Sequence, residues 1–274
     1  MLKKVKSIVI TGYGTNCEME TAHACRLASS DEVDIVHIST LLNGEKNLDD
    51  YHFLNLAGGF LDGDDLGSAK AGANRILHAK IKGTEEKLYD QFTRFIEQGK
   101  LILGVCNGFQ LLVKLGMLPG FDGNYRNQIA TVTFNDSGRF EDRWVYLLVN
   151  RNSPCVFTRN MEGIYLPVRH GEGKFITKND DVLKRLHRDQ RVVVRYSHAD
   201  YRESTMDYPA NPNGSVDGIA GICNETGRIF GLMPHPEAYL HYTNHPRWTR
   251  EKLPEEGMGL IIFKNAIDFL KNNL

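Results

Sequence analysis

One cysteine stands where a strand-like segment turns directly into a helix-like segment. The apolar run 101–105 leads through Gly104-Val-Cys106-Asn-Gly108 into a stretch whose apolar residues have helical spacing. This is the spacing of a nucleophile elbow, G-x-nucleophile-x-G, with cysteine in place of serine. Glycines are expected on both sides because larger side chains would collide with the neighbouring strand and helix. We therefore predict that Cys106 is a nucleophile, and that the adjacent helix N-terminus favours its thiolate.

A second motif could supply the base that such a nucleophile needs. The chain reads Met233-Pro-His235-Pro-Glu237 directly after an apolar, strand-like run. The two prolines stiffen the backbone around His235, and an extended backbone puts His235 and Glu237 on the same side. Taken alone, Cys106 could be a packing residue and the histidine–carboxylate pair a surface feature. Together they predict a Cys-His-Glu triad, with His235 as base and Glu237 as the group that orients it.

Composition excludes several classes of function. The 274 residues carry a formal charge of −1, with 33 basic and 34 acidic residues and no basic run, so nucleic-acid binding is not indicated. The first residues are expected to form a strand rather than a signal peptide, and no apolar stretch has membrane-spanning length. The five cysteines are scattered and none has CxxC spacing, which predicts neither a disulfide framework nor a zinc site. A reducing cytoplasm is the expected setting.

The pattern of elements predicts an α/β fold. Strands expected at 7–11, 33–38, 53–57 and 101–105 alternate with helices expected at 18–28, 69–76 and 85–98. This alternation favours a mostly parallel, doubly wound sheet. Strands expected at 130–134, 144–149, 192–196, 219–223 and 228–232 suggest an antiparallel extension of the same sheet, before a last helix at 256–272. No linker divides the chain, so residues 1–274 are expected to form a single domain.

Three motifs, in their order along the chain, carry a family resemblance: Gly58-Gly59-Phe60, the elbow around Cys106, and the Pro-His-Pro-Glu stretch ending at Glu237. Together they resemble the class I glutamine amidotransferases. The resemblance implies a three-layer, mostly parallel (mixed) sheet of flavodoxin-like type. It also implies that the triad hydrolyses L-glutamine to glutamate and ammonia through a glutamyl thioester.

The resemblance extends to the groups that would hold the substrate. It implies an oxyanion hole built from backbone N–H groups, one of them just after the nucleophile and one near Gly59-Phe60, and a glutamine beside the helix that follows the nucleophile. The implied oxyanion-hole and substrate-binding residues are Gly58, Gly59, Phe60, Asn107 and Gln110.

Longer stretches resemble one branch of this family, the glutaminase subunits of phosphoribosylformylglycinamidine synthase. They are Gly58–Leu66, Asn107–Gln110, Leu166–Gly173, Tyr208–Ser215 and Met233–Glu237. This resemblance implies a role in purine biosynthesis: ammonia passes to a synthetase subunit that converts formylglycinamide ribonucleotide to formylglycinamidine ribonucleotide. It implies a synthetase partner that uses ATP and Mg²⁺, joined by a small third subunit. It implies no cofactor or metal on this chain and no nucleic-acid or membrane partner.

Two residues depart from the pattern of that branch. Ala238 stands where arginine is usual, and Asp142 where cysteine is usual. Both are expected to affect contacts with the partner subunit rather than the triad. The loop residues His170 and Glu172 are expected to border the glutamine pocket or the ammonia exit, because glycines flank them and loops commonly carry function.

Other interpretations remain open at this point. The chain could be the glutaminase subunit of another amidotransferase complex. A cysteine peptidase of similar topology commonly has histidine directly after the nucleophile, where this chain has Asn107, and a silent regulatory module should have lost a triad member. The Gly12-Tyr-Gly14 stretch lacks the third glycine of a dinucleotide fingerprint. His241 and His245 are expected to be exposed loop residues rather than metal ligands.

Overall fold

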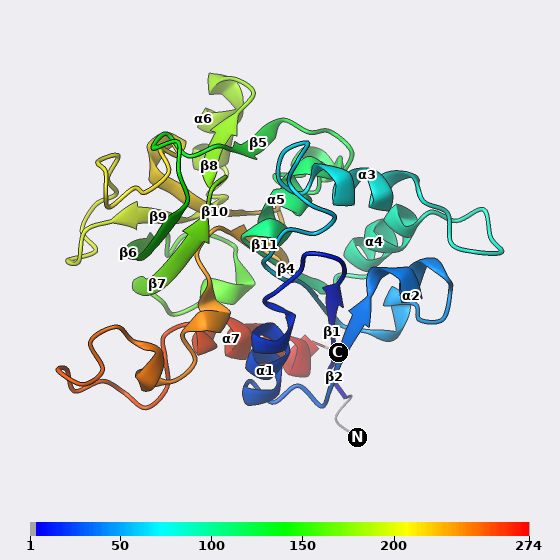
Figure 1. Cartoon of the computed structure of the whole chain (residues 1–274), viewed down its shortest axis with the longest axis horizontal. Helices are drawn as coiled ribbons and strands as arrows, with labels where there is room; N and C mark the ends of the chain where they lie inside the picture. The colour runs from blue at the N-terminus through cyan, green and yellow to red at the C-terminus, as the bar shows by residue number, and fades with distance from the viewer. Residues whose placement is uncertain (1–3, 274) are drawn as a thin grey trace.

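A nine-stranded sheet forms the centre of the computed structural model, which describes residues 4–273 (Figure 1). The strand order is β2-β1-β3-β4-β11-β10-β9-β6-β7. The five strands on one side run parallel: β2 (Glu32–His37), β1 (Lys6–Thr11), β3 (Phe53–Leu56), β4 (Leu101–Val105) and β11 (Ile229–Leu232). The remaining four are antiparallel to their neighbours: β10 (Ile219–Cys223), β9 (Val192–Ser197), β6 (Glu141–Val149) and β7 (Gly163–His170).

Helices cover both faces of the sheet. On one side α1 (Glu18–Leu27) packs against α7 (Leu260–Asn273); on the other, α3 (Lys70–His78) packs against α4 (Leu88–Glu97) and α5 (Asn107–Lys114) (Figure 1). The short α2 (Ile38–Leu42) and the peripheral α6 (Asp180–Arg188) complete the α-helices of the described residues, which also contain short 3₁₀ turns such as Pro236–Ala238. The expected three-layer, mostly parallel α/β fold is confirmed. None of the helices in residues 4–273 has both the length and the hydrophobicity to cross a membrane.

Local sequence explains why these elements form. Helix α4 buries Leu88, Phe92 and Phe95 on one face, and its first turn is capped because Asp90 accepts a hydrogen bond from the Lys87 N–H at 3.0 Å. In contrast, all five residues of β4 are buried. A continuous apolar run is what a parallel strand needs when helices cover both of its faces.

Two expectations about the second half of the chain are wrong. The strand expected at 130–134 is β5 (Ala130–Thr133), which leaves the main sheet and pairs with β8 (Lys174–Thr177) in a separate antiparallel ribbon. The strand expected at 228–232 is β11, which is parallel to β4 rather than part of a purely antiparallel extension. Alternation of residues identifies a strand but not its partner, because pairing is settled by long-range contacts. The single-domain assignment of residues 1–274 stays a prediction.

Candidate active site

The elbow around Cys106 has the sharp geometry that its sequence predicts. Strand β4 ends at Val105, α5 begins at Asn107, and Cys106 between them has φ +50° and ψ −103°. Such a backbone conformation is costly for a residue with a side chain and persists only where the surroundings enforce it. A Cβ at residue 108 would lie 1.9 Å from the Leu56 carbonyl oxygen, so the glycine there is required by close backbone approach.

The histidine reaches the same edge of the sheet from the neighbouring strand. Strands β4 and β11 are parallel, with Val105 opposite Leu232, so the segments that follow them leave the sheet together. The chain beyond β11 is held where the His235 N–H donates to the Pro167 carbonyl oxygen at 2.8 Å. This places His235 beside the elbow, although the two motifs are far apart in the sequence.

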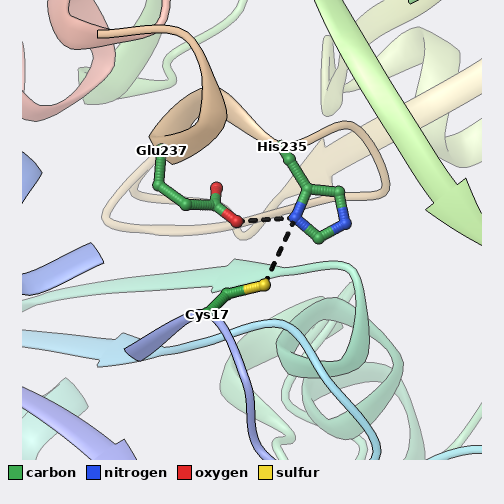
Figure 2. Close-up of side chains that lie close together, drawn as sticks. All are labelled: Cys17, His235 and Glu237. Atoms are coloured by element: carbon green, nitrogen blue, oxygen red, sulfur yellow. Dashed lines mark hydrogen bonds and ion pairs between the residues drawn. The ribbon is translucent and has the colours of Figure 1, made fainter. Parts of the chain in front are cut away.

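His235 and Glu237 form a buried pair. The His235 Nδ1 lies 2.6 Å from the Glu237 Oε1, and the two residues are only 2% and 3% exposed. The ring's Nε2 is buried and has no hydrogen-bond partner among the described residues (Figure 2 shows it on the opposite side of the ring from Glu237). This leaves one ring nitrogen to be oriented by the carboxylate and the other available for proton transfer.

The electrostatics of this pair suit a base. Burial by itself lowers the pKa of His235, but the Glu237 carboxylate and the interaction with Cys106 outweigh it, so the pKa is raised well above its ordinary value. The imidazolium is therefore stabilised when it accepts a proton. Cys106 is buried as well, and its Sγ lies 3.7 Å from the Arg169 carbonyl oxygen at the end of β7.

Two backbone N–H groups near the elbow have no acceptor among the described residues, as a binding site for an oxyanion would require. Asn107 is the first residue of α5, and neither its N–H nor that of Gly59 has an acceptor within residues 4–273. The Phe60 N–H instead donates to the Gly14 carbonyl oxygen at 2.7 Å, so within the Gly59-Phe60 pair the free donor is that of Gly59. Gly58 makes room for the base, because a Cβ there would lie 2.8 Å from the His235 Cε1.

The side chain of Gln110 is buried and held at both ends. Its Nε2 donates to the Glu172 main-chain carbonyl oxygen at 2.5 Å, and its Oε1 accepts from the Asn107 Nδ2 at 3.1 Å. Asn107 is fixed in turn, since its Oδ1 accepts from the Leu61 N–H at 3.1 Å. The implied substrate residues on α5 thus belong to one rigid hydrogen-bonded network.

The end of β7 and the turn that follows it border the site through their main chain rather than through the His170 ring. The expectation that His170 lies in a loop is wrong, because it is the last residue of β7 and pairs with Glu141. Besides the Glu172 carbonyl oxygen that meets Gln110, the Arg169 carbonyl oxygen faces Cys106. The His170 ring is buried and engaged on both nitrogens, as its Nδ1 lies 3.1 Å from the Asn135 Oδ1 and its Nε2 lies 3.4 Å from the Asn213 Nδ2. We conclude that this ring braces the segment and is not free to hold a ligand.

The motifs did not predict that Cys17 would lie against the base. Its Sγ is 3.9 Å from the His235 Nδ1, and Figure 2 shows Cys17 and Glu237 both directed at that nitrogen. Burial raises the pKa of the Cys17 thiol. Cys17, His235 and Glu237 bring three metal-binding atom types within 4.8 Å of one another, but Nδ1 and the carboxylate already bind each other. The signal that could have found it is its place in the turn after the first expected strand, since the carboxyl ends of parallel strands share one edge of the sheet.

The downstream histidines do not join this group. His241 bonds to Thr243 within its own turn. The expectation that His245 is exposed is wrong: it is 4% exposed and packs among the rings of Trp144, Tyr165 and Tyr239. Of the two unusual residues, Asp142 is exposed on β6 and Ala238 is half-buried beside the pair.

Comparison with known proteins decides the family. Residues 4–270 match the family described as a CobB/CobQ-like glutamine amidotransferase domain. The chain belongs to this glutamine amidotransferase family. The amidotransferase is 46% identical to phosphoribosylformylglycinamidine synthase subunit PurQ of Dehalococcoides mccartyi, over 98% of this chain and 99% of that protein. It is 42% identical to the subunit of the same name from Methanococcus maripaludis, over 98% and 99% of the two chains.

A solved structure agrees with these relatives. The amidotransferase superposes on a chain of the structure of PurLQS from Thermotoga maritima with a TM-score of 0.69 and 29% identity, covering 98% of this chain and 100% of that one. These comparisons confirm the resemblance of the sequence motifs to the glutamine amidotransferases and, among them, to the glutaminase subunits of phosphoribosylformylglycinamidine synthase. The site thus combines a strained cysteine, a buried histidine–glutamate pair and two N–H groups with no acceptor in residues 4–273, an arrangement suited to acyl transfer through a thioester.

Proposed function

We propose that this amidotransferase is the glutaminase subunit of a phosphoribosylformylglycinamidine synthase. It hydrolyses L-glutamine to glutamate and ammonia, and a synthetase subunit uses the ammonia to convert formylglycinamide ribonucleotide to formylglycinamidine ribonucleotide. The observation that carries this proposal is the 46% identity with a subunit of that synthase along the full length of both chains. The buried pair at 2.6 Å, beside the elbow cysteine, supports the same chemistry.

Cys106 is the proposed nucleophile and His235 the proposed base. The His235 Nε2 takes the thiol proton, and the thiolate attacks the side-chain amide carbon of glutamine. The N–H groups of Gly59 and Asn107 hold the resulting oxyanion, and loss of one such donor typically costs on the order of 3 kcal/mol in the transition state. The Glu237 carboxylate keeps the proton-accepting tautomer and stabilises the imidazolium, which agrees with the raised pKa of His235.

The tetrahedral adduct then loses ammonia. The C–N bond breaks as His235 returns its proton to the departing nitrogen, and a glutamyl thioester remains on Cys106. His235 next removes a proton from water, which attacks the thioester carbonyl. The C–S bond breaks, the sulfur regains a proton from His235, and glutamate leaves.

The proposed partners follow from the same likeness. We place this chain in a complex with a synthetase subunit and a small third subunit, in line with its similarity to a chain of PurLQS. ATP and Mg²⁺ are assigned to the synthetase, and no cofactor or metal to this chain. We expect a cytoplasmic location and low glutaminase activity of the isolated subunit, because hydrolysis without an acceptor wastes glutamine.

The decisive experiment reconstitutes the chain with the candidate synthetase subunits, ATP, Mg²⁺ and formylglycinamide ribonucleotide. Amidine formation from glutamine is compared with formation from ammonium salt, for wild type and Cys106→Ala. We expect the variant to lose the glutamine route and to keep the ammonium route. If wild type supports neither route while a glutamine-like electrophile still labels Cys106, the nucleophile stands and the pathway assignment is wrong.

A further inference from the structure

A closed chain of hydrogen bonds connects the two ends of the loop 61–68, which is part of the connection from β3 to α3. At one end, the Leu61 N–H donates to Asn107, and Asn107 donates to Gln110. Gln110 then donates to the Glu172 main-chain carbonyl oxygen. At the other end, the N–H of Ser68 reaches the Glu172 carboxylate at 3.1 Å and its hydroxyl does so at 2.9 Å. We call this set of contacts the circuit.

The circuit is buried along its whole length. Exposure is 2% at Asn107, 4% at Gln110, 0% at Ser68 and 8% at Glu172. A buried carboxylate is costly unless hydrogen bonds or a charge compensate it, and Glu172 has both: the two donors of Ser68, and the half-buried ammonium of Lys114 as its electrostatic neighbour. An acid retained inside the protein at this cost indicates a specific positional role.

The circuit links both halves of the oxyanion hole. One N–H donor belongs to Asn107, a member of the circuit, and the other belongs to Gly59, two residues before Leu61. Because Glu172 joins Ser68 to Gln110, it fixes how far the loop stands from α5. The bridge between Thr15 and Gly59 holds Gly59 itself, and the circuit ties the residues that follow it to the start of α5 through Leu61 and Asn107.

We propose that Glu172 is a positioning residue for the glutamine site, acting through Gln110 and the loop 61–68. This inference rests on the proposed function. Glu172 touches neither the reacting carbon nor the sulfur; its carboxylate anchors Ser68 while its carbonyl oxygen orients Gln110. A neutral amide of the same size offers only one acceptor oxygen to the N–H and hydroxyl of Ser68 and removes the charge that faces Lys114, so the Ser68 hydroxyl would have to reverse its role and accept from the NH₂ group.

The test uses Glu172→Gln in the reconstituted complex, with Ser68→Ala as a second variant that removes only the hydroxyl. Asp49→Asn is the matched control, because Asp49 also accepts charged hydrogen bonds, from Arg94, but lies outside the circuit. Labelling of Cys106 is followed with two reagents. A chloroketone analogue of glutamine needs the substrate site, whereas iodoacetamide needs only a reactive sulfur.

For Glu172→Gln we expect chloroketone labelling and glutamine-dependent synthesis to fall about tenfold or more, with iodoacetamide labelling and the ammonium route unchanged. Ser68→Ala should show a smaller loss of the same kind, and Asp49→Asn none. Equal loss with both reagents would reduce Glu172 to a structural role and overturn the proposal. Unchanged chloroketone labelling in both Glu172→Gln and Ser68→Ala would also overturn the proposal. Failure of the proposed function would be distinguishable from failure of this inference, because the wild-type complex would then show no glutamine-dependent synthesis at all.

Discussion

His170 is expected to make the stability of this protein depend on acid. Its ring is buried between Asn135 and Asn213, with the Nδ1–H donating to one amide and Nε2 accepting from the other. Burial, reinforced by the charge of His235, lowers the pKa of His170 to about 3. Charging this ring would leave a buried cation that faces the NH₂ group of Asn213. The folded protein therefore keeps His170 neutral.

The sign of the effect follows from this lowered pKa. In the unfolded chain a histidine titrates near 6.5, so below that pH the unfolded state binds a proton at His170 that the folded state does not bind. Stability is fully present above about pH 6.5 and is lost as the pH falls toward about 3. Between pH 8 and pH 5 the loss from this one group is about 2 kcal/mol, rising to about 5 kcal/mol below pH 3.

The measurement is the free energy of unfolding in urea at pH 8 and pH 5, for wild type and His170→Gln. The variant should be less stable at pH 8, because glutamine replaces only part of the ring's hydrogen bonding. Between the two pH values, wild type should lose about 2 kcal/mol more than the variant. Equal losses would refute the reasoning, since His170 would then titrate alike in the folded and unfolded states.

Three further changes test the site directly. Glu237→Gln should lower kcat by roughly 10³- to 10⁴-fold. It should also move the part of the pH–rate profile that reports His235 to lower pH, because the carboxylate that raises the pKa of His235 is gone. Steady-state kinetics of the complex over pH 5–9 measure both effects. Gly108→Ala should lower Tm sharply or prevent folding, since its Cβ would lie 1.9 Å from a backbone oxygen. The control Gly83→Ala has open space around the new Cβ but a φ of +79°, so it should lower the free energy of unfolding by only about 1 kcal/mol. Cys17→Ala should reduce kcat less than about tenfold, because its 3.9 Å contact is too long for a strong hydrogen bond; a loss as large as that of Glu237→Gln would contradict this ranking.

The sequence by itself determined the local chemistry. The glycines around Cys106 predicted the elbow, because only that backbone geometry needs small residues at both places, and the structure has the expected close approach at Gly108. The Pro-His-Pro-Glu motif predicted that His235 and Glu237 lie on one side of an extended segment, and the two groups do meet at 2.6 Å. The expected extended backbone is wrong, however, because Pro236–Ala238 forms a 3₁₀ turn with His235 at its N-cap. Signals of this kind concern neighbouring residues, whose relative positions follow from backbone geometry.

Only the tertiary structure decided what lies across from these motifs. The parallel pairing of β4 with β11 brings the base to the elbow, whereas the sequence favoured an antiparallel extension there. Cys17 meets His235, and Ser68 meets Glu172, across separations of 218 and 104 residues. No local pattern encodes such contacts, since they arise when the whole sheet and its helices pack together. That packing also removes His170 from water and so decides its charge, which its neighbours in the sequence could not determine.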